Sequence, residues 1–168
     1  MSKIDMMIKR TLVLGLVLMT AACGYQLRGA IDLPEQMRKI YLKNASNSLQ
    51  QQFTKTLKAS SVDVVKQINQ AGLVVAVFNE KMDRRVLSLS STGKASEFEL
   101  NYSLDYELQD ASGNVLKKPQ SIEITREYYN DQEAIIAKTN EEVIIQQELY
   151  QQAVKTIVNT ARSDLTAK

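Results

Sequence analysis

Residues 97–109 read Glu97-Phe98-Glu99-Leu100-Asn101-Tyr102-Ser103-Leu104-Asp105-Tyr106-Glu107-Leu108-Gln109. Every even-numbered residue in this stretch is apolar and every odd-numbered residue is polar. Because successive side chains of a β-strand point to opposite faces, the alternation predicts a strand with one buried face and one face in water. The fold is therefore expected to contain a sheet that is covered on one side of this strand.

A hairpin is expected directly after this strand. Its loop is Asp110-Ala111-Ser112-Gly113-Asn114, which combines the residue types that favour turns. Residues 115–128 then predict a returning strand with Ile122 and Ile124 on one face. Pro119 has no N–H to donate to a neighbouring strand, so the returning strand should lie at a sheet edge or contain a bulge there.

The strand before the alternating one is expected in residues 73–78, an apolar run rich in valine. Such a run suits a strand that is covered on both faces or lies at the centre of a sheet; a buried helix is the alternative, but the valine content favours the strand. Residues 86–91 also alternate, so this strand is either long or broken near Arg84 and Arg85. Thr92-Gly93-Lys94 is expected to form the turn that follows it.

Helices are expected on both sides of these strands in the sequence. A short strand at residues 40–42 precedes a helix from about Ser48 to Ser60, in which Leu49, Phe53 and Leu57 share one face. Residues 62–65 form a brief extended piece. Thr139-Asn140-Glu141-Glu142 matches a capping box and predicts the start of a long last helix, with a first turn possible at residues 131–136 and an end near residue 162.

The apolar stripe of the last helix is most simply explained by packing on the sheet, and a partner-binding groove is the alternative. It comprises Val143, Tyr150, Val154 and Ile157. The order of elements therefore predicts an α+β two-layer sandwich, a mostly antiparallel sheet of about four strands with two helices packed on it.

The amino-terminal residues have the composition of a secretory signal peptide. Lys9 and Arg10 precede an apolar run that is too short to cross a bilayer comfortably and that ends in Thr20-Ala21-Ala22. The single cysteine of the chain, Cys23, follows at the expected cleavage site, as in the bacterial lipobox. We expect Cys23 to be lipidated; a plain signal peptide followed by a chance cysteine is the alternative.

Lipidation divides the chain into three parts. Residues 1–22 would be removed, residues 23–34 would form a lipidated tether, and residues 35–168 would form a single α+β domain. Two or three acyl chains on one residue make membrane attachment effectively permanent. Gly24, rather than an aspartate, follows the cysteine. By the usual sorting rule this places the anchor in the outer membrane of a Gram-negative cell, facing the periplasm.

The composition of the mature chain disfavours several classes of function. Removal of residues 1–22 takes three basic residues and one acidic residue from the 21 and 19 of the whole chain, which leaves 18 of each. A neutral chain does not support nucleic-acid binding. The sequence contains no histidine, and its only cysteine is the expected anchor, so histidine- or cysteine-based catalysis and metal binding are excluded. We expect no enzyme activity and no cofactor.

Several short pieces resemble one family when taken in order. They are Cys23-Gly24-Tyr25-Gln26-Leu27-Arg28; Leu33-Pro34 with Met37; Ser96-Glu97-Phe98; Arg126-Glu127-Tyr128-Tyr129-Asn130; and Ala137-Lys138-Thr139-Asn140-Glu141-Glu142. Each is weakly specific alone, but their order along nearly the whole chain resembles that of the LPS-assembly lipoprotein LptE family. The resemblance implies a non-enzymatic lipoprotein that sits as a plug inside the outer-membrane β-barrel LptD in a 1:1 complex. It also implies a role in barrel assembly and in the transport of lipopolysaccharide to the outer leaflet.

Two other functions stay open at this point: a structural adaptor lipoprotein of another envelope machine and, less favoured, a lipoprotein enzyme. The resemblance also implies a lipopolysaccharide contact at one end of the domain, formed by Lys94 in the turn and by Lys138 before the last helix. The match around Lys138 supports that residue directly. Lys94 would supply its charge from a shifted position, because Ser91 stands where relatives would have an arginine, and Arg84 and Arg85 are possible substitutes. The alternative is that both lysines are ordinary surface residues.

Overall fold

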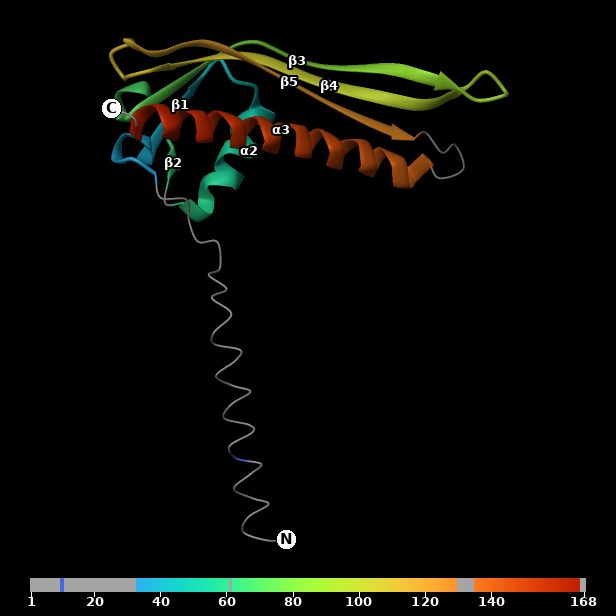
Figure 1. The fold of residues 1–168 in the computed structure, drawn as a ribbon, viewed down its shortest axis with the longest axis horizontal. Coiled ribbons are helices and arrows are strands. Elements are labelled where there is room, and N and C mark those ends of the chain that lie inside the picture. Colours follow the sequence, from blue (N-terminus) through green and yellow to red (C-terminus); the bar gives the residue numbers. More distant parts are fainter. Residues whose placement is uncertain (1–9, 11–32, 61, 130–134, 167–168) are drawn as a thin grey trace. The chain divides into compact units, whose positions relative to one another are not determined.

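The computed structural model describes residue 10 and residues 33–60, 62–129 and 135–166 (Figure 1). Cys23 and the residues around it lie outside this part. Contacts divide the chain into two units, Met1–Ile31 and Asp32–Lys168, and the second unit holds the elements of the fold. In chain order these are the short 3-10 helix η1 (Glu35–Arg38), β1 (Lys39–Lys43), α2 (Asn47–Leu57), η2 (Lys58–Ser60), β2 (Asp63–Val64), η3 (Ile68–Gln70), β3 (Leu73–Leu89), β4 (Ala95–Gln109), β5 (Val115–Tyr129) and α3 (Ile135–Thr166).

The strands form one sheet in the order β2-β1-β3-β4-β5. β3, β4 and β5 are antiparallel neighbours, whereas β1 runs parallel to both β2 and β3. The α+β class is confirmed. The sheet has five strands instead of about four, because the short extended piece at Asp63–Val64 pairs with β1.

β4 has the alternation that its sequence predicts. Its inner face packs under the helices and contains five buried residues, Leu100, Tyr102, Leu104, Tyr106 and Leu108. The odd-numbered residues from Asn101 to Gln109 point to the opposite, outer face and are partly exposed. The buried residues of β4 join those of β1, β3, β5 and both helices in one core, which includes Met37, Ile40, Phe53, Val75 and Ile157.

β3 is continuous from Leu73 to Leu89, so the break considered near Arg84 and Arg85 does not occur. Its irregularity lies earlier. Phe78 pairs with Asp105 and Lys81 pairs with Ser103, so two residues of β3, Asn79 and Glu80, stand opposite one residue of β4. This is a β-bulge, and Asn79 has a positive φ of 49° there.

The bulge reverses which residues of β3 face the helices. Val75 and Val77 belong to the inner face before it, whereas Met82 and Arg84 pair with inner-face residues of β4 after it. The residues Leu73 to Val77 are all buried, as expected for a strand covered on both faces.

β5 is an edge strand, and its pairing with β4 shifts near Pro119, since Tyr106 pairs with Gln120 and Leu108 with Lys117. Both expectations for Pro119 are therefore confirmed. In the β4–β5 turn, Asp110 Oδ1 accepts hydrogen bonds from the backbone N–H groups of Ser112 and Asn114 at 2.9 Å.

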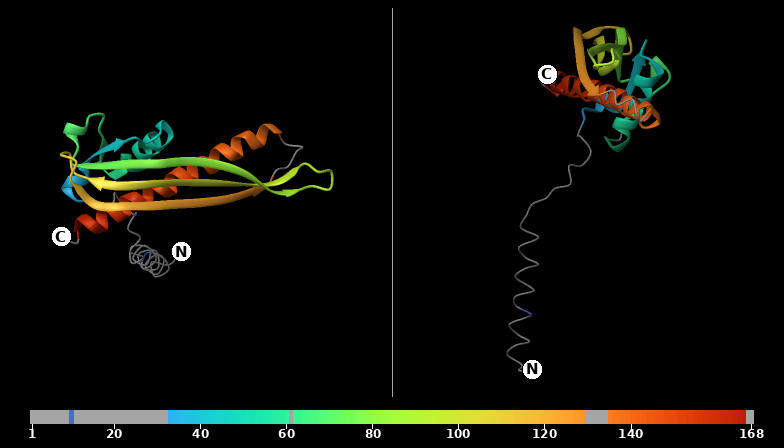
Figure 2. Two further views of the ribbon diagram at one scale, coloured as in Figure 1. Left: turned by 90° about the horizontal axis from the view of Figure 1, so that it is seen from above. Right: turned by 90° about the vertical axis from the view of Figure 1, so that its right-hand side faces the viewer.

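Both helices lie on the inner face of the sheet (Figure 2). α2 begins one residue before the expected start, after Ser46, whose hydroxyl oxygen accepts a hydrogen bond from Leu49 N at 3.2 Å. α3 begins at Ile135, so Thr139 is inside the helix and the capping-box assignment is wrong. Lys138 consequently lies within α3 and not before it.

Candidate functional site

The β3–β4 turn presents Lys94 to solvent. Ser90 and Lys94 close the turn through a hydrogen bond from Ser90 N to Lys94 O at 2.7 Å, and Gly93 N donates to Ser90 O at 2.9 Å. Gly93 has a φ of 77°, which glycine adopts without steric cost. The turn is therefore held by its own backbone and hydroxyl groups, and the exposed side chain of Lys94 takes no part in closing it.

The N-terminal end of α3 lies at the same end of the domain as the β3–β4 turn (Figures 1 and 2). This end of the helix carries Lys138, three residues after its start at Ile135. The side chain of Lys138 is outside the described part of the chain. The backbone thus brings the segments of the two expected contact residues, Lys94 and Lys138, to one end of the sheet.

Arg84 is bound to other residues of the domain and is a poor substitute for either lysine. Its Nη1 donates a hydrogen bond to Glu142 Oε2 at 3.0 Å, and its Cζ lies 4.6 Å from the centre of the Phe98 ring. Hydrogen bonds to Tyr128 and Glu142, in that order, raise the pKa of the Arg84 guanidinium above its ordinary value. This side chain therefore serves first to connect β3 with α3.

Arg85 points to the outer face and pairs with Glu99. Its Nη2 donates to Glu99 Oε2 at 3.0 Å, and its Nε donates to the other carboxylate oxygen. Glu99 is one of two buried polar residues among those described, with 7% of its surface exposed. Arg85 covers and neutralises this carboxylate, so it too is committed within the sheet.

The outer face of the sheet has further polar contacts between its strands. Asp105 on β4 accepts hydrogen bonds from Ser121 at 2.6 Å and from Asn79 at 2.7 Å, and these two bonds lower the pKa of its carboxyl group. Asn101 donates to Glu123 at 2.7 Å. In the described part of the chain no helix covers this face (Figure 2), so its polar groups are available to water or to a partner.

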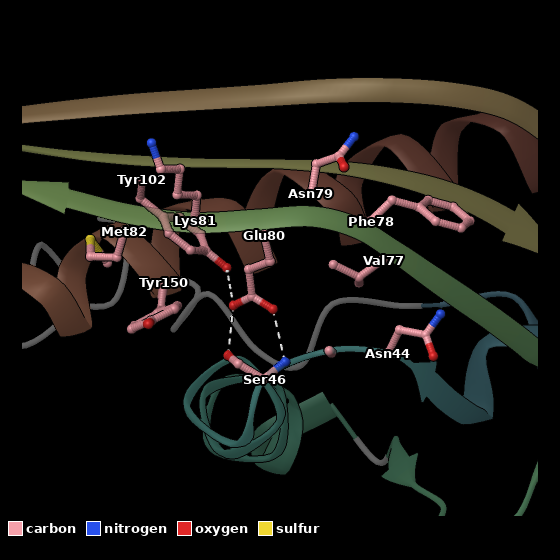
Figure 3. Close-up of a pocket in the computed structure, with 11 residues that line it drawn as sticks. Asn44, Ser46, Val77, Phe78, Asn79, Glu80, Lys81, Met82, Tyr102 and Tyr150 are labelled. Carbon is pink, nitrogen blue, oxygen red and sulfur yellow. Dashed lines mark hydrogen bonds between the residues drawn. The ribbon is translucent and has the colours of Figure 1, made fainter.

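A cleft of about 590 Å³ opens on the inner side of the β3 bulge (Figure 3). Glu80 lies at its centre and accepts hydrogen bonds from Ser46 N at 2.8 Å, from Ser46 Oγ at 2.6 Å and from Tyr102 Oη at 2.8 Å. Burial, followed by the hydrogen bond to Glu80, raises the pKa of Tyr102. Both carboxylate oxygens are occupied by groups of the fold, so Glu80 joins the N-terminus of α2 to the sheet.

Sequence reasoning missed the roles of Glu80 and Glu142. Glu80 acts through a bulge that no composition signal marks, and Ser46 is 34 positions away from it. Glu142 was assigned to a capping box, whereas its carboxylate contacts Arg84 and Tyr128 on two different strands. A pairing between residues 58 positions apart, such as Arg84 and Glu142, cannot be read from local spacing.

Among the described residues, no helix is both long enough and apolar enough to span a membrane. The same residues contain no group of three or more histidine, cysteine, aspartate or glutamate side chains that could hold a metal ion.

Comparison with known proteins identifies the family. The family model of LptE, described as lipopolysaccharide-assembly, matches residues 37–161. The LPS-assembly lipoprotein LptE of Pectobacterium atrosepticum is 28% identical over 152 residues, which cover 88% of this chain and 82% of the relative. The solution structure of an uncharacterized lipoprotein B from Nitrosomonas europaea superimposes with a TM-score of 0.68 at 25% identity, over 86% of this chain and 94% of that one. The family match spans well over half of the chain, and the chain therefore belongs to the LptE family of lipopolysaccharide-assembly lipoproteins.

Proposed function

We propose that this protein is an outer-membrane lipoprotein that forms a 1:1 complex with the β-barrel LptD as its plug, assists barrel assembly and binds lipopolysaccharide on its way to the outer leaflet. The observation that carries the proposal is the family match over residues 37–161, whose description is lipopolysaccharide assembly. The names of relatives such as that of Pectobacterium atrosepticum agree with it. The family is described by assembly and not by a reaction, which supports a non-enzymatic role.

The membrane anchor is assigned to Cys23. It is the only cysteine of the chain and stands directly after Thr20-Ala21-Ala22. Acyl chains contribute about 0.8 kcal/mol per buried CH₂, so two or three of them hold a protein of this size at the membrane permanently. Residues 23–34 then link the anchor to the domain that begins at η1.

Co-purification of the full-length lipidated protein in mild detergent tests the complex. We expect a β-barrel of much larger mass at 1:1 stoichiometry. Recovery of this chain alone as a monomer would contradict the proposal. Recovery of a different envelope assembly would support the second candidate, a structural adaptor.

The lipopolysaccharide contact is assigned to Lys94 and Lys138. Ammonium groups are strong donors to phosphates. Two of them at one end of the domain can bind the phosphates of lipopolysaccharide although the mature chain as a whole has no net charge. The exposed position of Lys94 and the location of both segments at one end of the sheet support the assignment.

A matched pair of variants tests the contact. Lys94→Asp with Lys138→Asp should weaken the binding of purified lipopolysaccharide at fixed ionic strength, in the mature chain carrying Cys23→Ala. Lys66→Asp with Lys118→Asp makes the same change in net charge at two other exposed lysines and should bind as the unsubstituted chain does. Equal binding by both double variants, each with the circular dichroism of the parent, would remove the two lysines from the site.

A further inference from the structure

The sheet and α3 both extend toward the β3–β4 turn. The distal sheet, defined here as residues 81–89 of β3, 95–103 of β4 and 123–129 of β5, leads to the β3–β4 turn. The first buried residue of α3 in the described side chains is Leu149, and none of residues 141–148 is buried. On the sheet side Val86 remains 49% exposed. Four residues of the distal sheet belong to the core, namely Leu100, Tyr102, Ile124 and Tyr128, and Ile145 of α3 packs against it. The two residues that follow Glu142, Val143 and Ile144, are exposed, so apolar packing holds this part of α3 only in part.

Glu142 connects the N-terminal part of α3 to the distal sheet, and further along the helix Gln152 accepts a hydrogen bond from Arg126 Nη2 of β5 at 3.1 Å. Glu142 Oε2 accepts hydrogen bonds from Tyr128 Oη at 2.8 Å and from Arg84 Nη1 at 3.0 Å, and Glu142 Oε1 accepts one from Gln146 at 3.3 Å. Arg84 belongs to β3 and Tyr128 to β5, so the contacts of this single helix residue reach both strands that flank β4.

Phe98 of β4 completes the group. Its ring centre lies 4.6 Å from Arg84 Cζ and 5.6 Å from the centre of the Tyr128 ring. A cation above an aromatic face and a tilted ring pair are both attractive arrangements. The side chains that bind Glu142 are thus themselves held in place by a residue of the central strand.

We propose that Glu142 is a positioning residue, which fixes the N-terminal part of α3 on the distal sheet and so sets the geometry in which Lys94 and Lys138 meet the phosphates of lipopolysaccharide. The inference rests on the proposed function of those two lysines. Lys138 is four residues, about one helical turn, before Glu142. Arg84 is on the strand that leads directly into the turn containing Lys94.

Charge repulsion and positioning predict opposite effects of removing Glu142 on lipopolysaccharide binding. A carboxylate near an anionic ligand is repelled by it, so simple loss of the Glu142 charge should strengthen lipopolysaccharide binding. If Arg84 were itself a phosphate ligand, loss of Glu142 would also free it to bind. A positioning role predicts the opposite, because the helix end is no longer held.

The main test is Glu142→Ala in the mature chain carrying Cys23→Ala, with purified lipopolysaccharide as the probe at fixed ionic strength. We expect binding about threefold to tenfold weaker, which lies within the span of about 2-fold to 30-fold that mutations acting through a contact network produce. Glu142→Gln keeps an acceptor oxygen for Tyr128 and should restore part of the loss. The double variant Arg84→Gln with Glu142→Ala should bind lipopolysaccharide no more weakly than the single variant that binds it least, because both substitutions remove the same contact.

Asp164→Asn is the matched control. Asp164 binds Lys117 at 2.9 Å and is the other α3 carboxylate that forms an ion pair with a strand among the described residues, but it lies near the opposite end of the helix. It should leave lipopolysaccharide binding unchanged. Unchanged or tighter binding by Glu142→Ala, or an equal loss in Asp164→Asn, would overturn the positioning role. Absence of binding by the parent chain would instead remove the proposed contact itself, and this inference with it.

Discussion

At the scale of single residues, Glu80 makes the junction between the sheet and α2. It satisfies the backbone N–H and the hydroxyl of Ser46, and Ser46 in turn caps the first turn of α2. Its third donor is Tyr102, whose side chain is fully buried. A buried hydroxyl without an acceptor costs free energy, so the Glu80 carboxylate should stabilise the fold even though it lies in an open cleft.

Glu80→Ala should therefore lower the free energy of unfolding by about 2–3 kcal/mol, since it leaves both Tyr102 and Ser46 N without their acceptor. Urea denaturation followed by circular dichroism measures the change. Glu148→Ala, at an exposed position of α3, is the control and should stay within about 0.5 kcal/mol. Similar values for the two variants would show that water replaces Glu80 at no cost.

Tyr128 gives stability a dependence on alkaline pH. Burial, and then its hydrogen bond to Glu142, raises its pKa from 10.0 to about 12. The unfolded chain therefore loses this proton first, and the contribution to stability, complete below pH 10, is lost as pH rises through about 12. Tyr128→Phe should reduce the fall in unfolding free energy between about pH 9 and pH 11.5. An identical slope in parent and variant would exclude Tyr128 as a source of the dependence.

At the scale of elements, β4 was predictable because its pattern is local and strictly alternating. β3 was only partly so, since the bulge at Asn79 and Glu80 reverses its inner and outer residues in mid-strand. The parallel pairing of β1 with β3 was missed because the sequence shows strands but not their neighbours. The start of α3 was misplaced because Thr139 matches a cap, yet no glycine or proline between Ile135 and Thr139 stops the helix from beginning earlier.

The bulge makes a specific demand at Asn79. Its φ of 49° is open to asparagine and glycine but is strongly disfavoured for a β-branched residue. Asn79→Val should thus be less stable than Asn79→Gly by about 1–3 kcal/mol, although both lose the hydrogen bond to Asp105. Urea denaturation of the two variants isolates the free-energy cost of the backbone conformation at position 79. Equal stabilities would mean that the strand can adopt another register at no cost.

At the scale of the whole molecule, the two faces of the sheet in the described domain differ in what they contact. The inner face and the two helices form the core, whereas the outer face carries partly or fully exposed carboxylates, including Glu107, Glu123 and Glu127. The sequence predicts a candidate ligand contact at Lys94 and Lys138, and the backbone places the segments of both residues at one end of the sheet; the contact itself stays a prediction. The groups that hold those segments in place were not predicted, because they depend on contacts between distant parts of the chain.

The outer face is the surface that we expect to meet the barrel wall. Interiors of large outer-membrane barrels are polar, so a plug needs a polar and complementary surface and not an apolar patch. The odd-numbered residues of β4, and those of β5 from Ser121 onward, provide such a surface without a helix over it in the described part of the chain. Reversal of its charges should therefore weaken the complex while leaving the core intact.

Glu123→Lys with Glu127→Lys is the suitable change, because both side chains are exposed and an exposed contact such as that of Glu123 with Asn101 contributes little to stability. We expect less barrel to co-purify with this variant than with the parent. Glu35→Lys with Glu148→Lys makes the same change in charge away from the outer face and serves as the control. If the control loses the barrel and the outer-face variant keeps it, the contact lies on the helical side; if both keep it, the outer face is ordinary solvated surface and the plug must be held elsewhere.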